Sequence, residues 1–301
     1  MEDLPAAGAA WSAERRRGDQ AELAEWLAFA LAICDETDPL ALRAFRSELT
    51  IDRKSDGSFV TAADREVERV IRERITARYP SHGLIGEEYG EAAAGAGGER
   101  WYIDPIDGTH NFMRGVPIFA TLLAVERDGE IQAGVISAPA LGQRWFASRG
   151  GGAWVSGGPP NPDGPRRLAV STVDSIDRAQ IFFRSIRDMD ASRVAAGFGG
   201  LIRAAWRERG FGDFWGYTLI ADGVGEAMME QDLHPWDLAA PWIVVEEAGG
   251  RVTDFDGRRS FERGEGFATN GVLHEVVLDK LTERAEGLAS GDTTGRRDAL
   301  T

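Results

Sequence analysis

With 301 residues, of which 43% are hydrophobic and 28% charged, the chain is long enough for one large globular domain or two fused halves. Its 34 Lys and Arg residues stand against 49 Asp and Glu residues, which gives a formal net charge of −15. This balance argues against nucleic acid or an anionic membrane surface as the partner, because both repel an acidic protein. A ligand that carries phosphate would therefore need bound cations.

The distribution of apolar residues and the cysteine content both favour a cytoplasmic protein. The first twenty residues contain no apolar stretch of signal-peptide length, and no window approaches eighteen apolar residues, so we expect a cytoplasmic protein. Cys34 is the only cysteine, which excludes an intramolecular disulfide and a thiolate metal cage and agrees with a reducing compartment. It lies on the apolar stripe of a predicted helix and is expected in the core.

The first half of the chain is predicted to mix helices and strands. Hydrophobic periodicity predicts helices over 20–33 and 61–78, a loop over 91–98, and strands over 83–86, 101–104, 118–127, 130–137, 144–148 and 153–155. Asp38-Pro39 predicts a kink or a second short helix after the first one. Asp128-Gly129 indicates a tight hairpin between two of the strands.

The second half begins after the loop-like stretch SGGPPNPDGP at 156–165. There the pattern predicts a strand over 181–183, helices over 213–222, 236–248 and 273–281, a short segment over 226–229 and a strand over 251–255. We expect one domain over 20–284, built of halves 20–155 and 165–284. Residues 1–19 and 285–301 are expected to be a flexible segment and a flexible tail.

The most informative motif is the run DPIDGT at 104–109, which directly follows the apolar residues Trp101-Tyr102-Ile103. Two carboxylates thereby arrive at the end of a predicted strand, and Pro105 stiffens the turn between them. Gly108 allows a sharp bend into a segment whose backbone N–H groups can face an anion if a helix begins there. The motif favours a metal and phosphate site over its alternative, an acidic turn that caps a helix.

Further acids also lie at the ends of predicted elements, where α/β proteins bind ligands. With the two acids of the motif they form the set Asp64, Glu87, Asp104, Asp107 and Asp237. These donors are all oxygen atoms and the four histidines (82, 110, 234 and 274) show no ligand spacing, so Mg²⁺ or Mn²⁺ is favoured over zinc.

Each of these acids taken singly has a structural alternative. Asp64 completes a T-x-x-D capping box with Thr61, and Asp237 stands at a predicted helix start where a cap is common. Glu87 and Glu88 could be solvated loop charges. For most of these acids the structural alternative is favoured when the residue is taken singly, whereas the five acids together favour a metal site.

Three segments, LIGEEYG, WYIDPIDGTHNF and PWDLAAPWIVVEEAGGRVTDFDG, resemble in sequence and order the inositol-monophosphatase-like family of metal-dependent phosphatases. The match covers roughly residues 20–283. The resemblance implies an α/β fold of five layers (αβαβα) with mixed sheets, usually in a homodimer. It also implies two or three bound Mg²⁺ ions and a small phosphorylated metabolite as substrate. The net charge, as above, predicts no nucleic acid and no membrane as partner.

The resemblance also implies a role for each matching residue. Glu87, Asp104 and the carbonyl of Ile106 look like ligands of the first metal, and Asp104, Asp107 and Asp237 like ligands of the second. Glu87 would also help to hold a weaker third ion. Metals fit the chemistry, because phosphomonoester hydrolysis needs accelerations up to about 10²¹, whereas one acid or base supplies about 10² to 10⁴.

Two further matches concern the reacting groups. Asp64 and Thr109 match the pair that orients and activates the attacking water. The N–H groups of Gly108 and Thr109 match the site that binds the phosphate.

Within the family, the segments SAPALGQRWFASRGGGAW and RGFGDFWGYTLIADG resemble the histidinol-phosphatase branch. This implies hydrolysis of L-histidinol phosphate to L-histidinol and phosphate, a step of histidine biosynthesis. Asp213 in the G-D-F sequence and Glu230, seven residues before Asp237, would then face the cationic leaving group. The alternative for Asp213 is a helix cap.

Other functions remain open within this resemblance. The substrate could be inositol 1-phosphate, fructose 1,6-bisphosphate or 3′-phosphoadenosine 5′-phosphate. A role outside catalysis is also known in the family, where one branch associates with the transcription machinery. The complete set of metal-ligand matches favours an enzyme.

Overall fold

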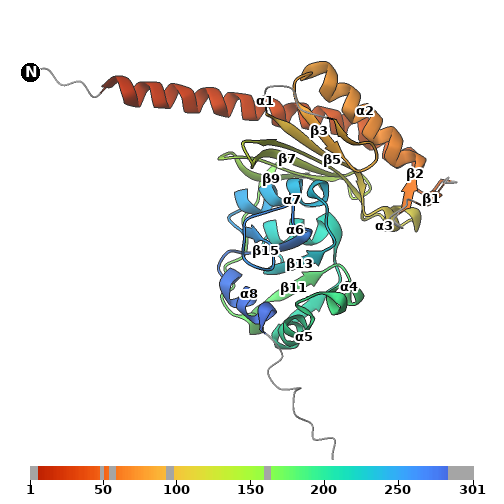
Figure 1. Cartoon of the computed structure of the whole chain (residues 1–301), viewed down its shortest axis with the longest axis vertical. Coiled ribbons are helices and arrows are strands. Elements are labelled where there is room, and N and C mark those ends of the chain that lie inside the picture. Colours follow the sequence, from red (N-terminus) through yellow and green to blue (C-terminus); the bar gives the residue numbers. More distant parts are fainter. Residues whose placement is uncertain (1–5, 48–50, 54–58, 93–97, 159–163, 284–301) are drawn as a thin grey trace, which may run out of the picture.

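The computed structural model describes residues 6–47, 51–53, 59–92, 98–158 and 164–283, and these residues stack in five layers (Figure 1). The long helix α1 (Ala6–Ala44) and α2 (Ala62–Arg78) cover the outer face of a large sheet. Helices α6 (Asp213–Ala221) and α7 (Pro235–Glu247) lie between this sheet and a smaller one, whose far face is covered by α4 (Ile186–Ala191), α5 (Ala195–Ala204) and α8 (His274–Thr282). The expected αβαβα fold is confirmed.

The larger sheet has eight strands within the described residues, in the order β10-β9-β8-β7-β6-β5-β3-β4. They are β3 (Gly83–Gly86), β4 (Gly90–Ala92), β5 (Arg100–Asp107), β6 (Ala120–Arg127), β7 (Glu130–Ala138), β8 (Gln143–Ser148), β9 (Gly152–Gly157) and β10 (Arg166–Arg167). β3 and β5 run parallel, and the other neighbouring strands run antiparallel. The sheet is therefore mixed, as expected.

The smaller sheet has five strands in the described residues, in the order β12-β11-β13-β15-β14. They are β11 (Gln180–Phe183), β12 (Arg207–Arg209), β13 (Ala227–Gln231), β14 (Arg251–Thr253) and β15 (Glu265–Thr269). β11 runs parallel to β12 and β13, whereas β15 pairs antiparallel with β13 and β14. A separate pair, β1 (Ile51–Arg53) and β2 (Phe59–Thr61), precedes α2.

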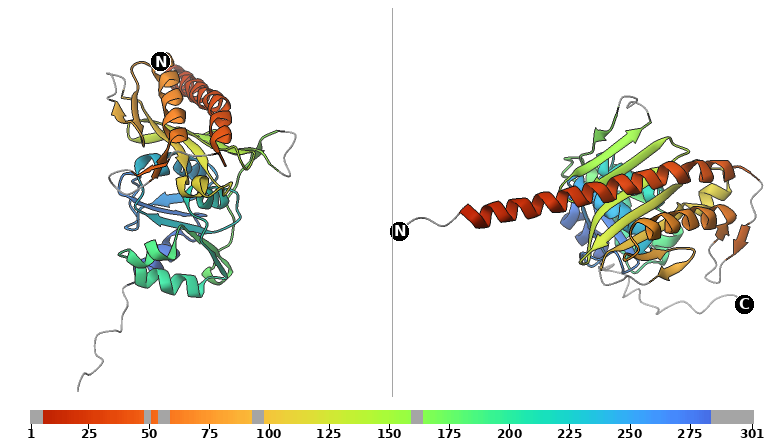
Figure 2. Two further views of the ribbon diagram at one scale, coloured as in Figure 1. Left: turned by 90° about the vertical axis from the view of Figure 1, so that its right-hand side faces the viewer. Right: turned by 90° about the horizontal axis from the view of Figure 1, so that it is seen from above.

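Helix α1 differs from the prediction at both ends. It begins at Ala6, within the segment expected to be flexible, and continues through Pro39 to Ala44 as one helix (Figure 2), so no second helix begins there. Proline is tolerated here because Arg144 of β8 binds the carboxylates of Asp35 (2.8 Å) and Asp38 (2.6 Å) and ties this part of the helix to the sheet. Cys34 is fully buried beside them, as expected.

Several predicted elements agree closely with the structure. α2 is capped by Thr61 and buries Val67, Ile71 and Ile75 on one face. The turn Asp128-Gly129 joins β6 to β7 with φ of 56° and 78°, the left-handed conformation at both positions that a two-residue hairpin turn of type I′ requires. Parts of the predicted loops, and residues 1–5 and 285–301 of the predicted flexible ends, lie outside the described residues.

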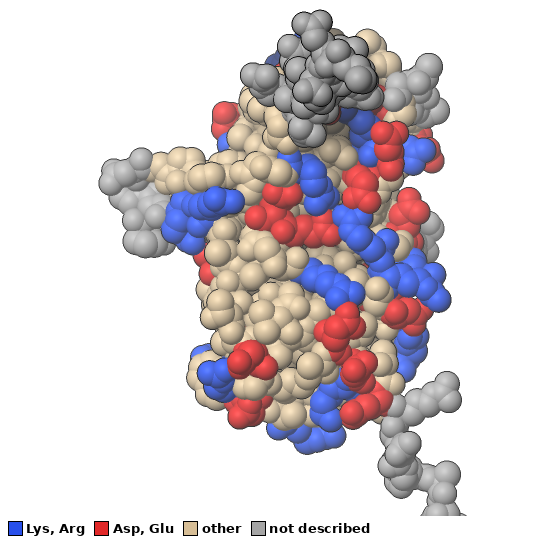
Figure 3. Space-filling model, turned by 90° about the vertical axis from the view of Figure 1, so that its left-hand side faces the viewer, with Lys and Arg blue, Asp and Glu red and all other residues tan. Residues whose placement is uncertain are grey.

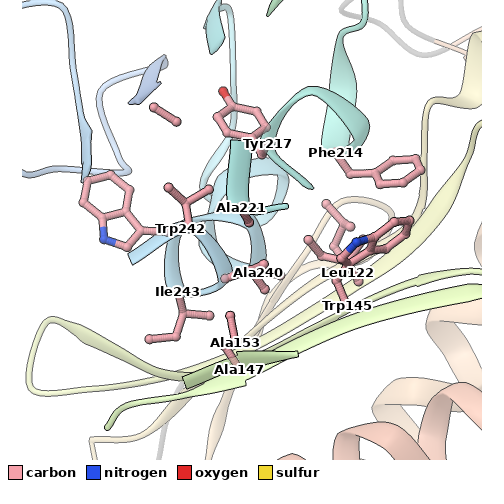
Figure 4. Packing of buried hydrophobic residues seen from close by; sticks show 14 of the residues in the cluster. Leu122, Trp145, Ala147, Ala153, Phe214, Tyr217, Ala221, Ala240, Trp242 and Ile243 are labelled. Atoms are coloured by element: carbon pink, nitrogen blue, oxygen red, sulfur yellow. The ribbon is translucent and has the colours of Figure 1, made fainter. Parts of the chain in front are cut away.

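The middle layer holds the molecule together, because α7 buries residues toward both sheets. Figure 4 shows Ala240 and Ile243 of this helix directly above Ala147 and Ala153 of the larger sheet. The approach is close at Gly134, where a Cβ atom would lie 2.7 Å from Ile243 Cγ2 and 3.1 Å from Ala240 Cα. Such close contact requires small residues in the sheet. It also fixes how near α7 lies to the larger sheet, and so the position of the first residues of α7.

The surface carries charges of both signs. On the face shown in Figure 3 acidic and basic side chains intermingle and do not gather into a patch of one sign. None of the helices in the described part of the chain is both long and apolar enough to cross a membrane.

His274, at the start of α8, is a buried titratable group in the core. Its Nδ1 lies 2.9 Å from Thr269 Oγ1 and its Nε2 lies 3.0 Å from Thr253 Oγ1. Burial lowers the pKa of His274 to about 4, with a smaller effect of the Arg251 charge in the same direction. The folded protein therefore holds this ring neutral where an unfolded chain, with a His pKa near 6.5, would protonate it.

We predict that stability falls as the pH drops from 6.5 toward 4, because unfolding then takes up a proton at His274. Above pH 6.5 this contribution is complete. Urea unfolding of the wild type and of His274→Gln, which cannot titrate, isolates the effect from that of the carboxylates. The wild type should lose more unfolding free energy than the variant over this window, and parallel losses would contradict the assignment.

Candidate active site

A cavity of about 460 Å³ lies where the end of β5, the short helix α3 (Thr109–Met113) and the starts of α6 and α7 meet. All the predicted site residues except Asp64 line it: Glu87, Asp104, Ile106, Asp107, Gly108, Thr109, Asp213, Glu230 and Asp237. Asp64 is buried next to this group, since its carboxyl interacts electrostatically with Glu87 and Asp104. Residues more than a hundred positions apart are thus brought to one place.

The strand that carries the DPIDGT motif is longer than predicted, since β5 continues to Asp107. Two residues three positions apart would face opposite sides of a regular strand. Here the register of β5 against β6 shifts between Asp104 and Asp107, and Thr121 Oγ1 donates a hydrogen bond to the carbonyl of Pro105 (2.9 Å) inside this bulge. The extra residue of the bulge is what lets both carboxylates face the cavity.

The chain then turns at Gly108 into α3. Gly108 has φ of 81°, a left-handed conformation that disfavours other residues, and a Cβ atom there would lie 3.0 Å from the carbonyl oxygen of Ile118. A larger residue would therefore suffer both backbone strain and a close contact. The hydroxyl of Thr109 donates to the carbonyl of Ile106 (3.1 Å). The Thr109 side chain is therefore held beside the two acids.

One oxygen of each central carboxylate is held by a backbone N–H group. The pairs are Asp104 Oδ1 with Ile106 N (3.0 Å), Asp107 Oδ2 with Phe214 N (2.6 Å) and Asp237 Oδ2 with His234 N (2.7 Å). These bonds fix the rotation of each carboxylate and so set the direction of its second oxygen. The structural alternative for Asp237, a cap at the start of α7, is also realised. Asp237 lies three residues after the cap residue His234, and its side chain accepts the hydrogen bond of a capping box.

The central carboxylates raise one another's pKa. The pKa of Asp104 lies well above its ordinary value because the side chain is buried and because Glu87, Asp107 and Asp237 are close. Burial, with Asp213 and Asp237 nearby, likewise holds the pKa of Asp107 well above its usual range. Burial raises the pKa of Asp237 to about 7. So much negative charge in one cavity calls for cations.

Asp64 combines its two alternative roles. Its Oδ2 accepts hydrogen bonds from Thr61 N (2.8 Å) and Thr61 Oγ1 (2.5 Å), which completes the capping box of α2. Its Oδ1 is buried and accepts no hydrogen bond from the described residues. Burial raises the pKa of Asp64 to about 6. A buried oxygen of this kind is costly unless a further group binds it.

Glu87 is positioned by Glu68, a residue that the sequence analysis did not single out. The N–H groups of Glu88 and Tyr89, just after Glu87, donate to Glu68 Oε2 (2.7 Å) and Oε1 (3.3 Å). Arg72 Nε donates to the same Glu68 carboxylate (2.7 Å). The sequence did offer one sign that Glu68 is buried, because this acid lies on the same face of α2 as the apolar residues Val67, Ile71 and Ile75.

The start of α6 binds two acids at once. Asp213 N donates to Glu230 Oε1 (2.9 Å), and Phe214 N donates to Asp107 Oδ2 (2.6 Å). These are the first N–H groups of the helix, which have no partner within it and carry the positive end of the helix dipole. Gly212 occupies the cap position and Asp213 is the first helical residue, so Asp213 is not the cap that was its alternative.

Glu230 and Arg184 complete this side of the cavity. Glu230 is buried beside the hydroxyl of Tyr217, and burial together with Asp213 raises the pKa of Glu230 to about 8. Arg184 lines the cavity as well, although its sequence context did not mark it, and Nε of Arg184 binds Asp188 Oδ2 at 2.9 Å. It supplies positive charge close to Glu230 and Asp213.

The donors of this cavity fit oxygen-liganded divalent cations. In the described residues no three Asp, Glu, His or Cys side chains converge as a ready-made metal cage. The cavity nevertheless gathers carboxylates whose mutual repulsion a divalent ion would relieve, since Glu87, Asp107 and Asp237 all surround the buried Asp104. Backbone and carboxylate oxygens are the ligands that Mg²⁺ and Mn²⁺ prefer.

Comparison with known proteins finds related phosphatases. The chain is 43% identical to a histidinol-phosphatase of Mycobacterium tuberculosis over 85% of this chain and 97% of that protein. It is 38% identical to a histidinol-phosphatase of Streptomyces coelicolor over 86% of this chain and 97% of that one. The extragenic suppressor protein suhB of Bartonella henselae, 26% identical, superimposes with a TM-score of 0.77 over 86% of this chain and 99% of its own.

The model of the inositol monophosphatase family matches residues 22–286, which is most of the chain and includes the whole cavity. Enzymes of this family are metal-dependent and act on phosphorylated metabolites. The chain belongs to the inositol monophosphatase family.

Proposed function

We propose that this protein is a Mg²⁺-dependent phosphomonoesterase that hydrolyses L-histidinol phosphate to L-histidinol and phosphate, a step of histidine biosynthesis. The observation that carries the substrate is the pair of acids, Asp213 and Glu230, which lines the cavity together with the carboxylate cluster. Histidinol phosphate offers an ammonium group to such acids, whereas inositol phosphate is a neutral polyol apart from its phosphate. The two relatives named histidinol-phosphatases support the same choice.

In this proposal Glu87, Asp104 and the carbonyl of Ile106 hold a first metal, and Asp104, Asp107 and Asp237 hold a second. Glu87 also contributes to a third. The ions are Mg²⁺, with Mn²⁺ as a substitute of the same ligand preference. When bound, they neutralise the phosphate and lower the pKa of a coordinated water.

The protein's own groups then position the reactants. Asp64, held on one side by Thr61, and Thr109, held by the carbonyl of Ile106, orient the attacking water and take its proton. The N–H groups of Gly108 and Thr109 at the start of α3 bind the phosphate. Glu230 and Asp213 hold the leaving group, and Arg184 beside them limits the excess negative charge.

We also propose a homodimer that works in the cytoplasm without nucleic acid or a membrane as partner. The net charge of −15 opposes both of those surfaces. Large apolar side chains stay exposed on the single chain, among them Trp206 (65% exposed) and Ile186 (56%), which a second copy could cover.

The bridging role of Asp104 has a direct test. Asp104→Asn should abolish phosphatase activity with Mg²⁺, because a neutral amide cannot balance two divalent ions. The metal-free variant should unfold at a temperature no lower than the wild type, since a buried charge is removed, and Mg²⁺ should raise this temperature less. Asp128→Asn in the exposed hairpin turn is the control and should change nothing. Activity of Asp104→Asn within about tenfold of the wild type, a barrier change of only ~1.4 kcal/mol, would rule out the bridge.

Asp64 and Thr109 should act as one unit. If both orient the same water, Thr109→Ala and Asp64→Asn will each slow turnover, and the double variant will be only slightly slower than the worse single one. Steady-state rates of the four proteins with histidinol phosphate and saturating Mg²⁺ give the coupling. A double variant whose loss equals the product of the single losses would mean that the two side chains act independently.

The acids on the leaving-group side should determine specificity. A charge-assisted hydrogen bond contributes about 1.5 to 3 kcal/mol, so Asp213→Asn or Glu230→Gln should lower kcat/KM for histidinol phosphate roughly ten- to a hundredfold. Both amides keep the structural role: asparagine tolerates the left-handed backbone of residue 213, and glutamine can still accept from Asp213 N. Inositol 1-phosphate should be affected much less. Equal losses with both substrates would make these acids supports of α6 only.

A further inference from the structure

We propose that a second cavity, next to the first, binds the imidazole ring of the leaving group between an aromatic wall and the carboxylate of Asp188. This inference rests on the proposed function and extends it to residues that determine specificity. The cavity has a volume of about 680 Å³. It shares His110, Arg184 and Asp213 with the first cavity, so the two adjoin with Asp213 at their junction.

The backbone at Asp213 is the first sign that this junction is functional. Asp213 has φ of 57°, a left-handed conformation that costs a residue other than glycine free energy. The conformation persists because Glu230 holds the Asp213 N–H and Phe214 N–H binds Asp107. Its result is that the Asp213 carboxylate lines both cavities, with Asn111 Nδ2 3.4 Å from Oδ2.

Aromatic side chains form one wall of the second cavity. The rings of Phe211 and Trp215 lie with centroids 4.6 Å apart and planes 35° apart, and Phe211 also stacks on the fully buried Phe182 at 5.8 Å. Phe211 and Trp215 are only partly buried and both line the cavity. A planar ring that enters can pack against them, as aromatic rings commonly do.

An acid stands in the same cavity. Asp188 in α4 lines it, and Arg184 Nε donates to Asp188 Oδ2. A carboxylate has about four acceptor positions, so Asp188 can accept a ring N–H as well as the arginine. An aromatic wall with one acceptor suits a heteroaromatic ring that carries an N–H group, and a polyol suits it poorly.

The order of groups in the ligand matches the order of the cavities. In histidinol phosphate the carbon that carries the ammonium group is bonded directly to the ester CH₂ group. A second CH₂ group joins this carbon to the imidazole ring. A phosphate at the carboxylate cluster therefore places the ammonium near Asp213 and the ring beyond it. The strained Asp213 thus separates two sites for two parts of one molecule.

The test compares two substrates that differ only by the ring. Histidinol phosphate is 2-aminoethyl phosphate with an added imidazolylmethyl group, so both present the same ester and ammonium. Trp215→Leu and Asp188→Asn should each lower kcat/KM for histidinol phosphate by tenfold or more and leave that for 2-aminoethyl phosphate within about twofold. Trp154→Leu, the same change at a partly buried tryptophan of β9 that lines neither cavity, should alter neither rate. Calorimetry with histidinol should show weaker binding to Trp215→Leu than to the wild type.

The outcomes separate this inference from the proposed function. Activity on 2-aminoethyl phosphate shows that a variant is folded, so an equal loss with both substrates assigns Trp215 and Asp188 to scaffold and overturns the inference. Unchanged histidinol phosphate hydrolysis in both variants overturns it too. A wild type that fails to hydrolyse histidinol phosphate while cleaving another phosphomonoester overturns the proposed substrate itself.

Discussion

The concentration of buried carboxylates in one cavity is the constraint that governs the rest of the structure. Asp104, Asp107, Asp237 and Glu230 each have a raised pKa because they are buried close to other acids. Without partners such a cluster would oppose folding. The fold answers with backbone donors: every one of these acids accepts a hydrogen bond from a main-chain N–H group. These hydrogen bonds do not neutralise all the negative charge of the carboxylates, and the remaining charge favours the binding of cations.

One of these donors joins the two halves of the chain. Asp107 belongs to the larger sheet, yet the N–H that binds it comes from Phe214 in the middle layer. Asp237 reaches the cavity because α7 packs between both sheets, and its depth depends on the close contact over Gly134. The site is therefore a property of the assembled layers. A change that lifts α7 from the sheet would disturb the ligands without touching one of them.

Local signals in the sequence predicted most elements of the first half and the acids of the site. α2, β3 and the Asp128-Gly129 hairpin follow from capping, apolar runs and turn residues that act over a few positions. Tertiary contacts decided the rest. Arg144 anchors α1 next to Pro39, and α5 contains three glycines, of which Gly197 packs so closely on α8 that a Cβ there would lie 2.0 Å from the carbonyl oxygen of Leu281. α4, α5, β12 and β15 were not predicted.

The residues that the sequence analysis missed in the site share one property. Glu68 and Arg184 carry no motif of their own, and only the fold brings Glu68 to the N–H of Glu88 and Arg184 next to Glu230 and Asp213. The site residues that the sequence analysis did identify combine a functional role with a structural one. One oxygen of Asp64 caps α2, whereas the other accepts no hydrogen bond from the described residues. A carboxylate can serve both purposes because it has two oxygens. A capping motif at the end of an element is therefore weak evidence against a catalytic role: the cap is what holds the second oxygen in place.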